Sequence, residues 1–145
     1  MNLSEERKRF LANDFSRGFI AFCGFEAVEV GEGAFVSRLS VRQDHRQQDT
    51  FVHAGVMAAM ADHTAGYAAF TLVEEDYRVL TVEFKINFFR PAAGDELRCE
   101  SKVVRRGRLI VVAESTVFDP AVGIEKPAAK ATVTMMPVPE KNLVQ

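Results

Sequence analysis

A single carboxylate, Asp62, lies within a long apolar segment of mostly small residues, FVHAGVMAAMADHTAGYAAF at residues 51–70. Alanine and glycine leave little bulk on any side of a helix, so the segment suits close contact with other structure on most of its faces. An ionised aspartate there is costly unless it has a partner or a chemical task. Because apolar surroundings raise the pKa of a carboxylate and make it a stronger base, Asp62 is a candidate general base.

The start of the same segment supplies a second candidate group. The apolar periodicity begins at Val56, which places His53, Ala54 and Gly55 at the N-terminus of the helix. Backbone amides in the first turn have no partner within the helix, and the helix dipole is positive at this end. Such amides can stabilise a developing oxyanion, and a glycine lets a carbonyl approach the backbone closely. The sequence therefore predicts an electrophile-binding site beside Gly55.

The spacing between these two groups predicts a site shared by two chains. Asp62 follows Gly55 by seven residues, so the two lie on one side of the helix but roughly 10 Å apart along its axis. One carbonyl cannot easily contact both groups of the same chain. If both serve one reaction, a second, antiparallel copy of the helix must bring its own aspartate to Gly55 across a dimer axis.

Structural roles for these side chains stay open. Asp62 can bond to a neighbouring backbone group or an arginine, and a lone histidine before a helix, such as His53, is more often a packing or capping residue than a catalytic one. His63 lies about 100° around the helix from Asp62, which favours a structural or interfacial role. The histidines lack zincin-like spacing and the two cysteines, Cys23 and Cys99, are distant, so we expect no metal site.

Alternating apolar and polar residues predict six strands around this helix. They cover residues 27–30 and 34–41 before the helix, and residues 78–87, 96–105, 109–118 and about 130–136 after it. The break at Pro91 to Asp95 predicts a hairpin between the first two strands that follow the helix. Four strands in succession predict an antiparallel meander.

The ends and the composition indicate one compact domain over residues 1–145. Residues 4–22 carry apolar side chains at three- and four-residue spacings, which predicts an amphipathic N-terminal helix, and residues about 140–145 are expected to form a flexible tail. The first residues are too charged for a signal peptide and no apolar run reaches ~18 residues, so we expect a cytoplasmic protein that does not act in a membrane. A net charge of −2 argues against nucleic acid as the main partner.

Basic residues gather at two places outside the helix. Arg105, Arg106 and Arg108 surround a predicted turn, and Arg90 precedes the break after the first long strand. Each of them alone is compatible with a solvated turn. As a group they can hold the phosphates of an anionic ligand.

The order of these elements resembles the hotdog fold, an α+β architecture in which an antiparallel sheet of about six strands wraps around one long central helix. Over about residues 24–138, the chain resembles the hotdog acyl-CoA thioesterases of the phenylacetic-acid-pathway (PaaI-like) type. In that subgroup His-Gly-Gly begins the central helix and an acidic residue follows about two turns later. Here the matching residues are His53-Ala54-Gly55 and Asp62, together with the His45-Arg46 pair, the Pro91-Ala92 break and the Arg105-Arg106-Gly107-Arg108 turn.

The resemblance implies that a homodimer or homotetramer hydrolyses an acyl-CoA thioester, with coenzyme A as part of the substrate and no separate cofactor. It implies that Gly55 donates its backbone amide to the thioester carbonyl. Asp62 of the partner subunit then acts as general base or nucleophile, and His53 helps to fix the loop or the thioester. Thr81 matches a hydroxyl-bearing residue that assists the attacking water.

Two positions depart from the pattern of that subgroup. Ala54 replaces the first glycine of the motif and adds only a methyl group, so the amide of Gly55 is retained. Gln47 stands where the subgroup has an asparagine that orients the water, and its side chain is one methylene longer. Two other functions stay open: a hotdog hydratase or dehydratase using His53 with Asp62, and an acyl-CoA-binding protein without catalysis. The sequence does not identify the acyl group.

Overall fold

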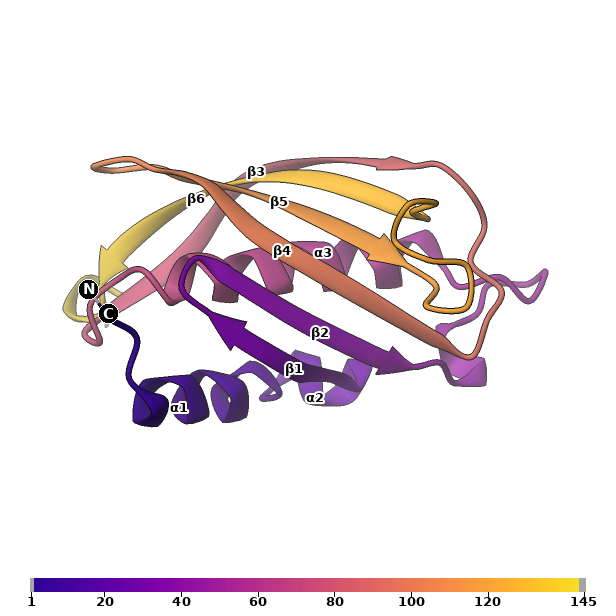
Figure 1. Ribbon diagram of the computed structural model, residues 1–145, viewed down its shortest axis with the longest axis horizontal. Coiled ribbons are helices and arrows are strands. Elements are labelled where there is room, and N and C mark those ends of the chain that lie inside the picture. Colours follow the sequence, from indigo (N-terminus) through magenta and orange to yellow (C-terminus); the bar gives the residue numbers. More distant parts are fainter. Residues whose placement is uncertain (1, 144–145) are drawn as a thin grey trace.

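A computed structural model describes residues 2–143 of the chain (Figure 1). In chain order the elements are α1 (Glu5–Phe15), α2 (Phe19–Cys23), β1 (Phe25–Gly31), β2 (Ala34–Ser40), a 3-10 turn (Gln43–His45), α3 (Ala54–Phe70), β3 (Tyr77–Phe88), β4 (Glu96–Arg106), β5 (Val111–Phe118), β6 (Ala129–Pro139) and a second 3-10 turn (Glu140–Asn142). Among the helices of residues 2–143, none is long and apolar enough to cross a membrane.

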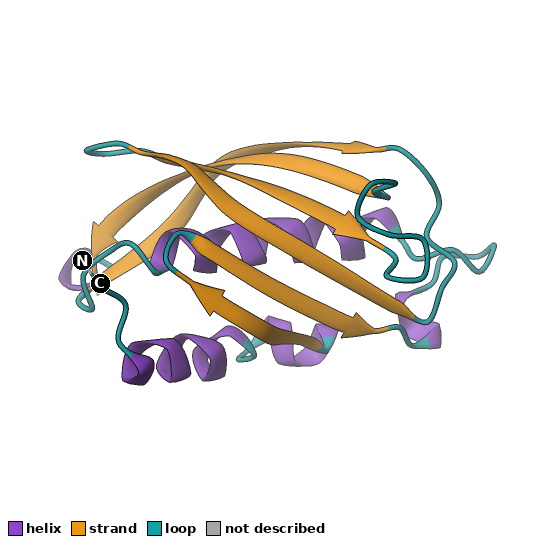
Figure 2. Cartoon of the chain, in the orientation of Figure 1, coloured by secondary structure: helices purple, strands orange, loops and turns teal. Residues whose placement is uncertain are grey.

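The six strands form one antiparallel sheet in the order β1-β2-β4-β5-β6-β3. The sheet curves around α3, and α1 and α2 lie beside the edge strand β1 (Figures 1 and 2). This arrangement confirms the α+β hotdog fold and all six predicted strands, with bounds that differ by a few residues at most.

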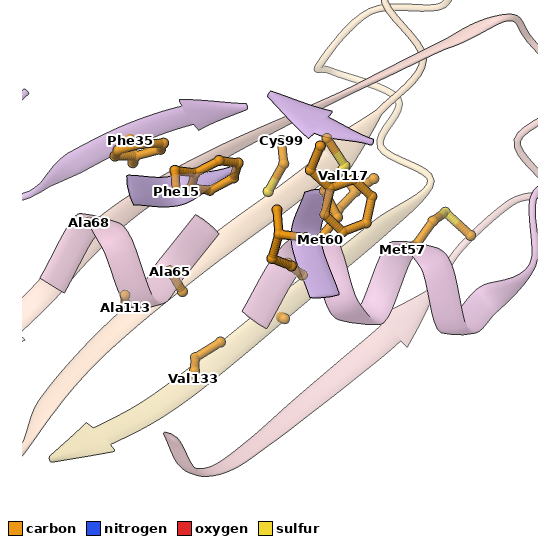
Figure 3. Packing of buried hydrophobic residues seen from close by; sticks show 14 of the residues in the cluster. Phe15, Phe35, Met57, Met60, Ala65, Ala68, Cys99, Ala113, Val117 and Val133 are labelled. Atoms are coloured by element: carbon orange, nitrogen blue, oxygen red, sulfur yellow. The ribbon is translucent and has the colours of Figure 1, made fainter. Parts of the chain in front are cut away.

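One face of α3 forms the centre of the core. Its buried side chains are mostly alanines and methionines, and Figure 3 shows Ala65 and Ala68 facing strand residues such as Val133. Methyl groups allow the sheet to approach the helix closely. The opposite face, which carries Asp62 and Gly66, is only half-buried. The expectation of close packing on most faces is confirmed for residues 56–70, none of which is exposed, and the side with Asp62 and Gly66 is the less covered one.

The predicted hairpin between the first two strands after the helix is wrong. β3 pairs with β6 along its whole length, whereas β4 pairs with β2 and β5. The connection from β3 to β4 instead crosses the N-terminal end of α3, where the Val52 N–H donates to the Ala92 carbonyl at 2.8 Å. The meander prediction holds for β4, β5 and β6. It fails for β3, which pairs only with β6 and forms one edge of the sheet.

The N-terminal segment forms two helices instead of the single predicted helix at 4–22. Gly18 has a φ of +58°, which ends regular helix between α1 and α2. The Ser16 hydroxyl donates to the Phe25 carbonyl at 3.0 Å and turns the chain toward β1. The last residue of α1, Phe15, is fully buried and its ring stacks on Phe35 at a centroid distance of 4.9 Å. Helix α1 therefore belongs to the core.

The predicted tail at about 140–145 is partly structured. The Glu140 N–H donates to the Asp76 carbonyl at 2.7 Å, and the Glu140 carboxylate pairs with Arg78 at 2.8 Å. These contacts tie the second 3-10 turn to the start of β3, so the prediction is wrong for residues 140–142. Residues 144–145 lie outside the described part of the chain.

The two edge strands of the sheet have different surroundings. β1 packs against α1, whereas β3 has no further strand beside it among residues 2–143. Phe84 and Phe88 of β3 pair with the buried core residues Val133 and Ala129, so their side chains face the helix, yet they are 38% and 45% exposed. An edge strand with exposed aromatic residues is a surface that natural proteins usually cover.

Candidate active site

Asp62 and Thr81, both predicted site residues, are brought together by α3 and β3. The Thr81 hydroxyl donates to Asp62 Oδ1 at 2.7 Å. Directly after Thr81, the register of β3 shifts past Val82, which marks a β-bulge in the edge strand. A bulge bends a strand locally and re-aims its side chains. Asp62 is therefore held by a charge-assisted hydrogen bond on the less covered face of the helix.

A cavity of about 440 Å³ extends from Asp62 along α3 toward its C-terminal end. Gly66 lies one turn beyond Asp62, and a Cβ at this position would meet no atom within 4 Å. The volume is within the range of small-molecule sites. The lining residues are Asp14, Asp62, His63, Gly66, Tyr67, Phe70, Arg78, Val79, Leu80, Thr81 and Leu143.

The polar groups of this cavity wall are mainly hydrogen-bond acceptors. The Tyr67 hydroxyl donates to Asp14 at 2.7 Å, and burial together with the Asp14 carboxylate raises the pKa of Tyr67, so its proton stays in that bond. The His63 Nε2–H donates to the Phe15 carbonyl at 2.8 Å. Burial lowers the pKa of His63, which favours the neutral ring and leaves Nδ1 as an acceptor.

Arg78 has three of its five N–H groups in hydrogen bonds to the chain's own atoms. Its guanidinium donates to the carbonyls of Glu75 and Tyr77 and to the carboxylate of Glu140. These bonds hold the start of β3 in place and use both terminal nitrogens of the side chain. The cavity beside Asp62 is therefore suited to a neutral group that donates hydrogen bonds, and it disfavours anions.

At the other end of α3, His53 caps the helix. Its Nδ1 accepts a hydrogen bond from the Gly55 N–H at 2.8 Å. The amide predicted to receive a carbonyl is thus occupied by the imidazole. Since Nδ1 accepts, the ring proton resides on Nε2. At this exposed corner the His53 Nε2–H is therefore the donor left for a carbonyl oxygen, beside the Gly55 N–H that His53 caps.

A separate cavity of about 520 Å³ opens at this corner. It brings together the predicted residues Gln47, His53 and Arg90. The Gln47 carbonyl oxygen accepts from the Asp49 N–H at 2.6 Å, so its amide nitrogen is the part left to contact a ligand. The lining residues are Gln47, Gln48, Phe51, Val52, His53, Ala54, Met57, Phe88, Phe89, Arg90 and Pro91.

The His45-Arg46 pair holds the loop that carries His53. His45 is buried: its Nδ1 accepts from the Arg42 N–H at 2.8 Å and its Nε2–H donates to the Cys23 carbonyl at 2.6 Å. The His45 carbonyl accepts the His53 N–H at 2.8 Å. The Arg46 guanidinium donates to carbonyls on both sides of this loop, including Thr50 at 2.9 Å. The pair positions the helix N-terminus without lining the cavity.

The basic residues predicted to act as a group are divided within one chain. Arg90 lines the cavity at the N-terminal end of α3. Arg106 and Arg108 line a cavity of about 320 Å³ with Glu74 and other residues just beyond the C-terminal end of α3. Figure 1 shows the β4–β5 tip, which also carries Arg105, at the opposite end of the molecule from the loop before α3.

Several residues of the Asp62 cavity were not recognised from the sequence. Gly66 follows Asp62 by four residues, a spacing that places two residues on one helix face, so its position beside Asp62 could have been predicted from the sequence. Tyr67 is beside it. Asp14 had no local signal, because only the packing of α1 on α3 brings it to Tyr67.

The chain thus presents two half-sites on the less covered face of α3, one with carbonyl-binding donors and one with a carboxylate. This fold and these groups define a hotdog protein equipped for chemistry at a carbonyl carbon. Residues 50–124, which include α3 and much of both cavities, match the family model described as the thioesterase superfamily. The chain belongs to the thioesterase superfamily, and its relatives support a hydrolase.

Solved structures and a curated relative agree with this assignment. A thioesterase family protein from Silicibacter pomeroyi is 32% identical, with a TM-score of 0.83 over 89% of this chain and 96% of that chain. A thioesterase from Haemophilus influenzae shares the fold, with a TM-score of 0.83 at 19% identity over 97% of this chain and 94% of that one. A 1,4-dihydroxy-2-naphthoyl-CoA hydrolase from Listeria monocytogenes is 26% identical over 66% of this chain and 78% of its own length.

A methyl group at Gly55 tests the His53 corner. A Cβ there would lie 3.0 Å from His53 Nδ1 and 3.2 Å from Cε1, so Gly55→Ala displaces the imidazole. We expect turnover to fall about tenfold, less than the 10²-fold that a 1 Å misplacement can cost. Thermal unfolding should change little, because the position is exposed and alanine favours helix. Unchanged turnover in a thiol-release assay would contradict a role for this corner.

Proposed function

We propose that the chain is an acyl-CoA thioesterase whose active site forms between two copies. The observation that carries the proposal is the separation of His53, which is hydrogen-bonded to the Gly55 N–H, and Asp62 into different cavities along α3. Each cavity alone lacks half of the groups needed to hydrolyse a thioester. Two copies supply both halves twice.

The free edge β3 favours a particular pairing. If two β3 strands pair antiparallel, the sheets continue into each other and the less covered faces of two α3 helices meet, running in opposite directions. The exposed Phe84 becomes buried, and the Asp62 cavity of each copy faces the His53 corner of the other. A homodimer is the minimum for this site. The homotetramer and the cytoplasmic location stay predictions.

The proposed reaction begins at the His53 corner. The thioester oxygen accepts a hydrogen bond from the Gly55 N–H, from His53 Nε2–H, or from both, which makes the carbonyl carbon more electrophilic. Asp62 of the partner subunit takes a proton from water while the water oxygen bonds to that carbon. The tetrahedral intermediate then releases the coenzyme A thiolate, which takes up a proton, and leaves the free acid. Direct attack by Asp62 is the alternative route to the same products.

The two cavities suggest where each part of the substrate lies. The acyl group extends from the partner's Asp62 along the groove beside Gly66, and coenzyme A leads away past Arg90. Because the groove wall offers acceptors and the Asp14 carboxylate, we expect it to favour neutral acyl groups with a hydroxyl donor over carboxylated ones. The Listeria monocytogenes relative is named for a dihydroxylated aryl-CoA, which supports this choice.

Release of free thiol from a panel of acyl-CoA esters tests the function. We expect hydrolysis of aryl and hydroxylated acyl groups, and weak hydrolysis of succinyl-CoA. A change in double-bond absorbance without free thiol would indicate the dehydratase alternative. Binding without turnover would indicate the acyl-CoA-binding alternative.

Gly66→Val tests the location of the acyl group. The position has room for a side chain, so valine fills the groove without displacing the chain's own atoms. We expect hydrolysis of aryl-CoA esters to fall about tenfold, within the 10- to 200-fold effect of small volume changes in a pocket, while acetyl-CoA hydrolysis is retained. Gly66→Ala serves as the smaller matched change. An equal loss for all acyl groups would place the acyl chain elsewhere.

A further inference from the structure

The buried face of α3 offers few features that fix its position along the sheet. Ala61, Ala65, Ala68 and Ala69 are fully buried and present only methyl groups to the strands. A surface of alanine methyl groups allows close approach, but it does not fix the rotation of the helix or its position along the sheet. Close approach does, however, let short strand side chains reach the backbone of the helix.

Thr64 belongs to one of two series of hydrogen bonds at this surface. Its hydroxyl donates to the Met60 carbonyl at 2.6 Å. Ser37 of β2 lies 2.7 Å from the same hydroxyl. A hydroxyl has one proton, and that of Thr64 is already used, so Ser37 is the donor in this contact. This series of hydrogen bonds runs from Ser37 of β2 through Thr64 to the Met60 carbonyl.

Ser115 of β5 belongs to the second series of hydrogen bonds. Its hydroxyl donates to the Ala61 carbonyl at 2.7 Å, and Ser101 of β4 lies 2.5 Å from it. By the same reasoning Ser101 donates to Ser115. The Cys99 thiol lies 3.7 Å from Ser101, and burial raises its pKa to about 11, so it stays protonated and can donate. All four residues of this series are buried.

The two series of hydrogen bonds end on consecutive carbonyls immediately before Asp62. The Met60 carbonyl belongs to the peptide group that joins Met60 to Ala61, and the Ala61 carbonyl belongs to the one that joins Ala61 to Asp62. Two strands therefore bond directly to the helix on the buried side of Asp62: β2 through the Ser37–Thr64 contact and β5 through the Ser115–Ala61 bond, with β4 behind Ser115. On the open side, Thr81 of β3 holds its carboxylate.

We infer that Thr64 and Ser115 are positioning residues for Asp62, setting the rotation and axial position of α3 where the carboxylate projects. The inference rests on the proposed function for its catalytic meaning. Neither hydroxyl contacts substrate, and each acts through a helix carbonyl. Ser37 is the strand partner through which Thr64 is joined to β2, whereas Ser101 lies one bond behind Ser115 and contributes less to that position.

Two matched pairs of variants test this role by separating kcat from KM. Thr64→Val removes the hydroxyl at nearly constant shape, whereas Thr64→Ser keeps it. Ser115→Ala removes the bond to the helix, whereas Ser101→Ala removes only the bond behind it. We expect kcat to fall about tenfold in Thr64→Val and Ser115→Ala with KM within about twofold, because sub-ångström misplacement acts on the reacting geometry. Thr64→Ser and Ser101→Ala should retain near-native kcat.

The carboxyl ¹³C resonance of Asp62 gives a readout that needs no turnover. It should shift in Thr64→Val and Ser115→Ala, and stay near the native value in Thr64→Ser and Ser101→Ala. If the native chain releases no thiol, the proposed function fails while this resonance still decides the positioning role. Equal kcat losses or equal shifts within each pair, at comparable thermal stability, would overturn the inference, as would native behaviour of all four variants.

Discussion

Asp62→Asn is expected to lower kcat for thioester hydrolysis by about 10²–10⁴-fold, the range of a general-base contribution. The amide has nearly the same shape, and its oxygen can still accept the Thr81 hydrogen bond seen at 2.7 Å. The substitution therefore removes the base and leaves the surrounding contacts in place. Thiol release measured at saturating acyl-CoA, with KM determined in parallel, gives the result.

Thr81→Val provides the comparison for this prediction. It removes only the hydroxyl that orients the carboxylate, so its effect on kcat should be clearly smaller than that of Asp62→Asn. Near-native turnover by Asp62→Asn would remove Asp62 from the mechanism. A larger loss in Thr81→Val than in Asp62→Asn would instead transfer the main role to the threonine.

Phe84→Asp is expected to convert the proposed dimer into monomers and to reduce activity by about 10²-fold or more, because the carbonyl-binding donors and the base then belong to separate molecules. Phe84 is 38% exposed on the edge strand β3 and lines neither half-site cavity. An aspartate there must be desolvated when two edges pair, which opposes association. Light scattering at the concentration of the activity assay measures both effects together.

Val28→Asp is the matched control on the opposite edge of the sheet. Val28 belongs to β1 and is 42% exposed, so the change in exposed apolar surface is similar. This variant should retain the native mass and the native activity. A Phe84→Asp monomer with full activity would show that one chain completes the site alone.

The amino-acid pattern predicted α3 to within a residue, and it indicated the two ends of the proposed catalytic arrangement. Small residues around a single acid, and a glycine after the capping His53, are local signals that do not depend on the rest of the chain. The seven-residue separation of Gly55 and Asp62 also predicted that they would not meet within one chain, because helix rise is constant. Consistent with that prediction, His53, which caps Gly55, and Asp62 line separate cavities.

Other features required the tertiary structure. Alternation predicts that β3 is a strand but not that it pairs with β6, since one apolar face can pack against several neighbours. Likewise, Asp14 meets Tyr67, and Ser115 meets the Ala61 carbonyl, only because distant segments pack on α3. Helical rise and strand alternation are set by neighbouring residues, so they can be read from the sequence. Pairing partners, cavity walls and buried hydrogen-bond chains depend on which surfaces pack together, and this is determined only when the whole chain has folded.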